Sequence, residues 1–268
     1  MIDIDEYYPL TPTQLDSYRQ NGFIKLKNVL SPQTLAYFNS EFTRKVLELN
    51  TLHLSMEERT TYQKAFLQVM NLWQHSPIIK EFVFGQKLAR IATDLMGVNG
   101  VRLYHDQALY KESGGGITPW HADQYYWPLS SNKCVTVWIP LQETSLNMGP
   151  LAFSVGSHQL EIGRNLGISD ESEAYLQQAL VKAELDELET PFDLGEVSFH
   201  SGWTFHHAGA NITDICREVM TIIYMDKDMH LSAPTNENQL ADWRQWCPGV
   251  EIDNLIDSPL NPILYQQA

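Results

Sequence analysis

The pattern of the sequence changes near residue 100, and this change limits the folds that the chain can adopt. Beyond it, short runs rich in β-branched and aromatic residues alternate with Gly, Pro and Asn; they are VRLYHDQALYK, CVTVWIPLQE, GEVSFH and REVMTIIYM. Short strands with turn residues between them are typical of an antiparallel sandwich or barrel. We therefore predict a mainly β core.

The first hundred residues have a helical pattern instead. Ser31-Pro32 predicts a helix start, with a serine N-cap and a proline in the first turn. Four apolar residues then recur at helical spacing and mark a buried stripe: Leu35, Phe38, Phe42 and Val46. One more helix, predicted for residues 171–188, interrupts the β region. We interpret it as a solvated surface helix, with a lid over the site as the alternative.

No internal repeat or low-complexity linker divides the 268 residues, so we predict one domain. In this domain, residues 1–98 form a mainly helical N-terminal support and residues 99–230 form the β core. Residues 231–268 follow as a C-terminal extension.

Charge and cysteine content limit the class of partner. The chain has 18 basic and 33 acidic residues, and its net charge of −15 opposes binding to nucleic acid or to an anionic membrane. Its three cysteines form no C-x-x-C, and the N-terminus MIDIDEYYPL lacks the pattern of a signal peptide. We expect a cytoplasmic protein that acts on a small molecule. Nothing in the sequence indicates an oligomeric state.

The stretch WHADQYYW contains a candidate metal site. Of nine histidines, only His121 is followed at the second position by an acidic residue, Asp123. On an extended strand these two side chains point to the same side and can share a metal. Two histidines and one carboxylate form the facial triad of non-haem Fe(II) enzymes, which leaves open positions for other ligands. A third ligand on a distant strand is therefore expected.

The region FHSGWTFHHAGANITDICREVMTIIYM offers that ligand. It contains His200, His206 and His207, and Arg217 opens a strongly β-patterned run. An arginine near an iron indicates a dicarboxylate, since its planar fork binds a carboxylate bidentately. Fe(II), 2-oxoglutarate and this arginine form a self-consistent set. Adjacent strand residues face opposite ways, so only one of His206 and His207 can point inward.

These motifs resemble the phytanoyl-CoA dioxygenase family of Fe(II)/2-oxoglutarate oxygenases. The resemblance rests on His-Ala-Asp at residues 121–123, MGPLAFSVGSH at 148–158, GEVSFH at 195–200, and HHAGAN ahead of Arg217. In that family the distal histidine stands five residues before an asparagine and about eleven before the arginine, which selects His206. The resemblance also implies that Trp138, Gln107 and Lys111 line the 2-oxoglutarate pocket.

The resemblance also implies a fold and an activity. The fold would be a double-stranded β-helix, a cupin-like jelly-roll. The enzyme would be an oxidoreductase that uses Fe(II), O2 and 2-oxoglutarate, releases succinate and CO2, and hydroxylates a C–H bond of a small metabolite. Some members have a serine where this chain has Ala208, and halogenase relatives replace the aspartate that is kept here as Asp123.

Alternatives stay open at this point. The same site could catalyse desaturation, epoxidation or cyclisation. A cupin-like metalloprotein or binding protein without 2-oxoglutarate would not need Arg217. Three aromatic residues near the ligands are candidates for the wall of the substrate pocket: Tyr125, Trp127 and Trp203.

Overall fold

The computed structural model describes residues 2–267, which form mainly strands and helices. The strands are β1 (Phe23–Leu26), β2 (Leu67–Met70), β3 (Gly100–Tyr110), β4 (Thr118–His121), β5 (Cys134–Pro140), β6 (Leu151–Ser154), β7 (Glu187–Glu189), β8 (Val197–Ser201), β9 (His206–Ala208), β10 (Val219–Asp226) and β11 (Ile263–Gln266). The helices are α1 (Pro12–Asn21), α2 (Pro32–Leu49), α3 (Thr61–Ala65), α4 (Pro77–Val83), α5 (Gln86–Met96), α6 (Asp170–Lys182) and α7 (Glu237–Trp246).

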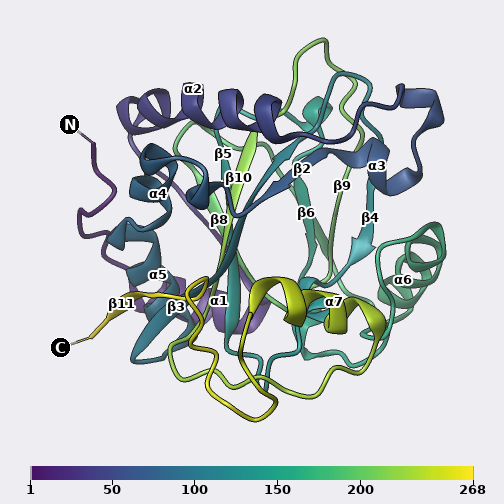
Figure 1. Ribbon diagram of the computed structural model, residues 1–268. Helices are drawn as coiled ribbons and strands as arrows, with labels where there is room; N and C mark the ends of the chain where they lie inside the picture. The colour runs from purple at the N-terminus through teal and green to yellow at the C-terminus, as the bar shows by residue number, and fades with distance from the viewer. Residues whose placement is uncertain (1, 268) are drawn as a thin grey trace.

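The strands form two antiparallel sheets. The larger has seven strands in the order β1-β8-β5-β10-β3-β11, with β2 also paired to β3, and the smaller has the order β4-β9-β6-β7. In Figure 1 the smaller sheet lies on one side of the larger one, and α4 and α5 lie on its other side. The prediction of a mainly β core with helices in front is confirmed.

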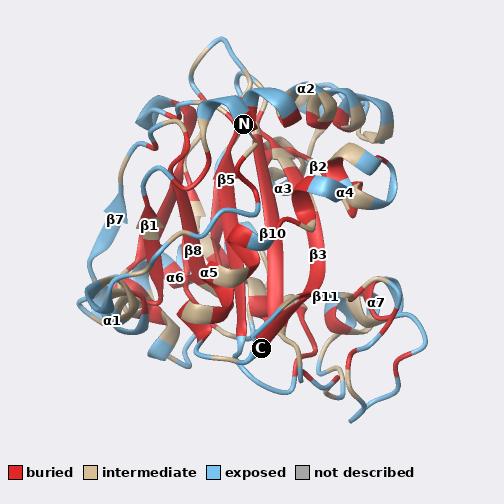
Figure 2. Ribbon diagram, turned by 90° about the vertical axis from the view of Figure 1, so that its left-hand side faces the viewer, coloured by how far each residue is buried: buried red, intermediate tan, exposed pale blue. Residues whose placement is uncertain are grey.

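Side chains alternate across the larger sheet and separate two environments. On β10, Met220, Ile222 and Tyr224 join the main apolar cluster, which also contains the residues of α2 and α5 that face the sheet. Val219 and Thr221, which alternate with these residues, face the other way, toward the smaller sheet. The sheet is therefore buried on both faces, as its red strands in Figure 2 show.

The helix predicted after Ser31-Pro32 is confirmed as α2. The Ser31 side chain accepts a hydrogen bond from the backbone N–H of Thr34, which satisfies one of the free donors of the first turn. The predicted stripe is buried against the sheet: Leu35, Phe38, Phe42 and Val46.

The helix predicted for residues 171–188 is wrong at its C-terminal end. α6 stops at Lys182, because Glu184 adopts a left-handed φ of 55° and the N–H of Leu185 bonds back to the Leu180 carbonyl. Residues 187–189 then form β7, which pairs with β6. The helix is also only partly solvated, since Leu176 and Leu180 are buried in a cluster with Trp120.

Both terminal regions contribute strands to the larger sheet. The N-terminal region supplies β1, which pairs with β8, and β2, which pairs with β3. The C-terminal extension supplies β11, which pairs with the other end of β3. No helix within residues 2–267 is long and apolar enough to cross a membrane.

Candidate metal centre and its cavity

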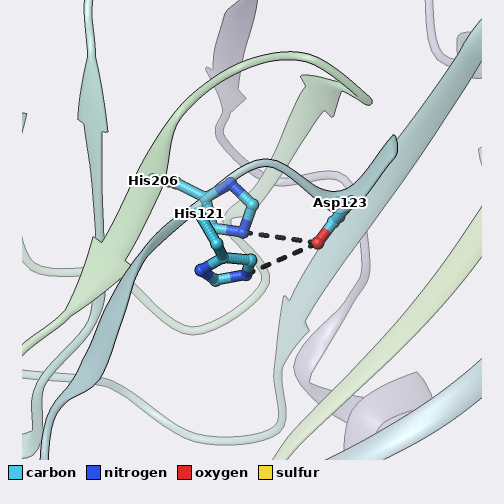
Figure 3. Close-up of side chains that lie close together, drawn as sticks. All are labelled: His121, Asp123 and His206. Carbon is cyan, nitrogen blue, oxygen red and sulfur yellow. Dashed lines mark ion pairs between the residues drawn. The ribbon is translucent and has the colours of Figure 1, made fainter. Parts of the chain in front are cut away.

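His121, Asp123 and His206 converge at one end of the smaller sheet (Figure 3). His121 is the last residue of β4, and His206 is opposite it at the start of β9. Asp123 is not on the strand, since it begins a 3-10 helix over Asp123–Tyr126. Ala122 between the two is extended, with φ −123° and ψ 131°. Because Ala122 is extended, the side chains of His121 and Asp123 still point to the same side, as they would on a strand.

The ligand atoms are spaced for one ion. Nε2 of His121 and Nε2 of His206 each lie 3.6 Å from Oδ1 of Asp123. All three ligand atoms lie within 4.8 Å of one another. Nitrogen and oxygen ligands lie about 2.1 Å from such a metal, so two ligands of one ion are at most about 4.2 Å apart. A small inward movement would thus bring all three into contact with a metal.

Backbone carbonyls fix the tautomer of both histidines. Nδ1 of His121 lies 2.7 Å from the Pro119 carbonyl, and Nδ1 of His206 lies 3.0 Å from the Thr204 carbonyl. A carbonyl can only accept, so each Nδ1 carries the hydrogen and each Nε2 keeps its lone pair for a metal. The donor set fits a divalent cation with nitrogen and oxygen ligands, such as Fe(II).

The second oxygen of Asp123 is held by protein groups. Its Oδ2 accepts hydrogen bonds from Oγ1 of Thr136, at 2.8 Å, and from Nε2 of His200, at 3.2 Å. Burial alone would raise the pKa of Asp123, but the neighbouring histidines His206, His121 and His200 hold it well below the ordinary value. The carboxylate is therefore anionic, with Oδ1 left free for a metal.

His207 points away from this centre. Its Nε2 bonds Oε1 of Glu187 at 3.0 Å, and its ring packs on Trp120 with centroids 4.1 Å apart. The structure thus places His206 on the inner face of β9 and His207 on the outer face, beside β7. His200, the third histidine of the region, contacts Asp123 but is not part of the three-residue cluster.

The three residues line a cavity of about 200 Å³ between the two sheets. Arg217 also lines it, and its buried side chain has no acidic partner among the residues that the structure describes. Nη1 donates to the Gly149 carbonyl, while Nε finds no acceptor within residues 2–267. Burial lowers the pKa of Arg217 to about 10, which leaves it charged at neutral pH. A buried cation in this state is costly unless an anion binds it.

Trp138 and Lys111 surround the arginine. The guanidinium lies 5.4 Å from the centre of the Trp138 ring, in a cation–π contact. Nζ of Lys111 donates to the carbonyls of Gly116 and Gly209, at 2.6 and 2.7 Å. Burial and then the charge of Arg217 lower the pKa of Lys111 to about 6. Arg217 is therefore the permanent positive charge at this end of the cavity.

The other residues singled out from the sequence lie in three places. Gln107 and Trp127 line the cavity, and Oε1 of Gln107 accepts from Nε2 of Gln68 at 2.6 Å. Lys111 lies behind Arg217, to which it is joined by a backbone bridge. Tyr125 and Trp203 instead line a neighbouring hollow of the surface.

Sequence reasoning missed several residues of the cavity wall. Thr136 and His200 lie on the same face of the larger sheet as Trp138, so strand alternation in CVTVWIP and GEVSFH could have found them. Tyr126 and His105 lie in the quoted stretches WHADQYYW and VRLYHDQALYK but were not singled out. Others come from segments with no recognisable motif: Tyr62, Phe66, Gln68, Met70, Ile168 and Asp242.

Comparisons with known proteins agree with one another. The family model described as phytanoyl-CoA dioxygenase (PhyH) matches residues 18–219. A protein of Stutzerimonas stutzeri, named probable alpha-ketoglutarate-dependent hypophosphite dioxygenase, is 26% identical over 230 residues, which are 80% of this chain and 78% of that protein. The peroxisomal phytanoyl-CoA dioxygenase of Bos taurus is 23% identical, over 82% of this chain and 70% of its own length.

A solved structure shares the fold. The epimerase SnoN, in complex with Fe3+, alpha ketoglutarate and nogalamycin RO, superposes with a TM-score of 0.79 at 23% identity. The match covers 94% of this chain and 98% of that one. The arrangement of two sheets and supporting helices is therefore common to both proteins.

Proposed function

The chain belongs to the phytanoyl-CoA dioxygenase family, and we propose that it hydroxylates a C–H bond of a small metabolite at an iron bound by His121, Asp123 and His206. The protein is an Fe(II)- and 2-oxoglutarate-dependent dioxygenase. Fe(II) with O2 supplies the oxidising chemistry, in which 2-oxoglutarate is converted to succinate and CO2. The protein's residues bind and orient the reactants and keep water away.

Arg217 would bind the distal carboxylate of 2-oxoglutarate. The observation that supports this role is a buried guanidinium, without an acidic partner in the described part of the chain, in the same cavity as the metal cluster. Trp138 on β5 covers the guanidinium and Gln107 lines the cavity from β3, so both would contact the bound cosubstrate. Lys111 would add positive charge behind it once an anion raises its pKa.

We also propose that the two sheets form a double-stranded β-helix of the jelly-roll type. Support comes from the two facing antiparallel sheets, with the metal cluster at one end of the smaller sheet. The whole chain would then be one domain, because strands from both terminal regions complete the larger sheet.

Asp123 favours hydroxylation over halogenation. Its Oδ1 faces both histidines, so it would occupy the coordination position that a halide needs. Its Oδ2 is tied to Thr136 and His200, which prevents the carboxylate from swinging away.

The test is the conversion of 2-oxoglutarate to succinate by the purified protein with Fe(II), with and without a metabolite library. We expect succinate in each case and, for the right metabolite, a product 16 Da heavier that requires 2-oxoglutarate. His206→Ala should abolish both products, and His207→Ala is the matched control that retains them. If folded wild-type protein binds Fe(II) but forms no succinate, the proposal is wrong and a metalloprotein without 2-oxoglutarate takes its place.

A further inference from the structure

The C-terminal extension supplies an acidic group to the wall of the cavity. Asp242 lies on α7 and lines the same cavity as the metal cluster and Arg217. The hydroxyl of Tyr104, on β3, donates to Oδ2 of Asp242 at 2.6 Å. The buried hydroxyl of Tyr104 thereby fixes one carboxylate oxygen of Asp242 and orients its side chain.

A β-bulge brings Tyr104 and His105 to the same side of β3. Ile223 of β10 pairs with His105 and Tyr224 pairs with Leu103, so Tyr104 is the extra residue. The rings of Tyr104 and His105 then lie 5.1 Å apart, although neighbours on a regular strand face opposite ways. The buried side chain of Asn261 donates to the carbonyls of Leu103 and Tyr104, which stabilises the bulge.

Asp242 has no positive charge beside it in the wall. Among the described residues that line the cavity, Arg217 is the one lysine or arginine. The backbone of Arg217 lies far from the bulge. Arg217 forms a β-bridge with Lys111, which follows the last residue of β3 and is six residues after His105. At about 3.3 Å per residue, that separation is roughly 20 Å along the strand. The cosubstrate end is therefore cationic and the opposite end acidic.

His105 adds a neutral polar group at the acidic end. It is buried, lines the cavity, and its Nδ1 has no hydrogen-bond partner within residues 2–267. Burial lowers the pKa of His105 to about 3, so the imidazole is uncharged. Burial likewise raises the pKa of Asp242 to about 7, as expected for a carboxylate without a cation.

Aromatic rings complete this end. Tyr126 and Trp127 line the cavity, and the Trp127 ring lies 5.4 Å from that of Tyr104. A carboxylate among aromatic faces suits a ligand with a positively charged nitrogen, which gains an ion pair and cation–π contacts together. The same wall offers nothing to the phosphates of a coenzyme A ester, which need cationic donors.

We propose that the substrate carries a basic nitrogen, bound as an ammonium group by Asp242, with His105 as a neutral hydrogen-bonding partner. This inference rests on the proposed function and names its substrate class. Binding of the nitrogen at this end would leave the carbon skeleton between Asp242 and the metal cluster. Asp242 would then determine specificity without taking part in the oxidation.

The experiment compares amines with alcohols of the same carbon skeleton, such as cyclohexylamine and cyclohexanol. Binding is measured by calorimetry on the full chain loaded with Fe(II) and 2-oxoglutarate in the absence of oxygen. We expect at least tenfold tighter binding of the amine. Asp242→Asn should remove this preference, and Asp242→Glu should restore part of it. Glu237→Gln, which removes an exposed charge from the same helix, should leave the preference unchanged.

The two proposals fail separately in this design. Equal binding of the amine and the alcohol by the wild-type protein overturns the present inference, as does a preference that survives in Asp242→Asn. Because calorimetry requires no turnover, a lack of succinate formation overturns the proposed function alone. The comparison on wild-type protein remains decisive even if Asp242→Asn does not fold.

Discussion

Arg217→Lys should weaken the binding of 2-oxoglutarate while the fold survives. The Arg217 side chain is 1% exposed, its Nη1 is engaged by the Gly149 carbonyl, and its Nε is free. The free edge of the guanidinium can therefore make two parallel hydrogen bonds to a carboxylate. Lysine keeps the charge but offers a single point of contact, so one of the two bonds is lost.

The magnitude follows from the strength of such bonds. A hydrogen bond to a charged group contributes about 1.5–3 kcal/mol. Since about 1.4 kcal/mol corresponds to a factor of ten, losing one bond should raise the KM for 2-oxoglutarate by about ten- to a hundredfold. Arg217→Ala loses both bonds and should bind the cosubstrate more weakly still.

The assay is succinate formation against 2-oxoglutarate concentration, with binding to the Fe(II)-loaded protein measured in parallel by calorimetry. Arg90→Lys is the matched control, because Arg90 packs on the ring of Tyr265 and is not part of the cavity wall. Its KM for 2-oxoglutarate should equal that of the wild type. Unchanged affinity in Arg217→Ala would refute the role of this residue and favour a metalloprotein without 2-oxoglutarate.

Further predictions concern the same centre. His121→Ala, Asp123→Ala and His206→Ala should each abolish most Fe(II) binding in calorimetry, whereas His207→Ala should retain it, because that ring faces Glu187. Thr136→Val removes a hydrogen bond to Asp123 and should lower iron affinity by about ten- to a hundredfold. Arg217→Met should leave the melting temperature of the metal-free protein unchanged or raised, since it removes an unpaired buried charge, but should abolish the thermal shift caused by 2-oxoglutarate. Turnover in chloride should yield no chlorinated product by mass spectrometry.

The pair His121 and Asp123 could be located from sequence because local geometry determines it. Two ligands separated by one residue need only an extended backbone, and Ala122 provides it even though the strand has ended. Strand alternation predicts that His206 and His207 face opposite ways, as the structure has them, but the resemblance to the family, through its spacing to Asn211 and Arg217, is what selected His206. The meeting of His121 with His206 depends in addition on the pairing of β4 with β9, which the local pattern does not determine.

The asparagine that accompanies the distal histidine in the family pattern has a structural explanation. Asn211 is fully buried, and its Nδ2 donates to the carbonyls of Lys111, Glu112 and Ile215. These bonds tie the loop before Arg217 to the end of β3. In this chain Asn211 thus anchors the loop that positions Arg217.

The acidic end of the cavity could not be predicted in this way. Asp242 reaches the cavity because α7 packs beside the 3-10 helix that Asp123 begins, a contact between segments more than a hundred residues apart. No local pattern in ENQLADWRQW distinguishes Asp242 from a solvated acid on a surface helix. Tyr125 and Trp203 show the converse, since closeness in sequence to a ligand did not place either side chain in this cavity.

The bulge at Tyr104 decides which side chains of β3 reach the site. Before the bulge, the odd-numbered residues Val101 and Leu103 face the helices. After it, the even-numbered residues Ala108 and Tyr110 face them, so the bulge exchanges the two faces of the strand. Read as a regular strand, VRLYHDQALYK would place His105 and Gln107 on the same face as Leu103, away from the cavity. One inserted residue, held by Asn261 from the C-terminal extension, instead turns both toward the metal cluster. The chemistry of this strand therefore depends on a residue more than 150 positions away, which alternation alone cannot reveal.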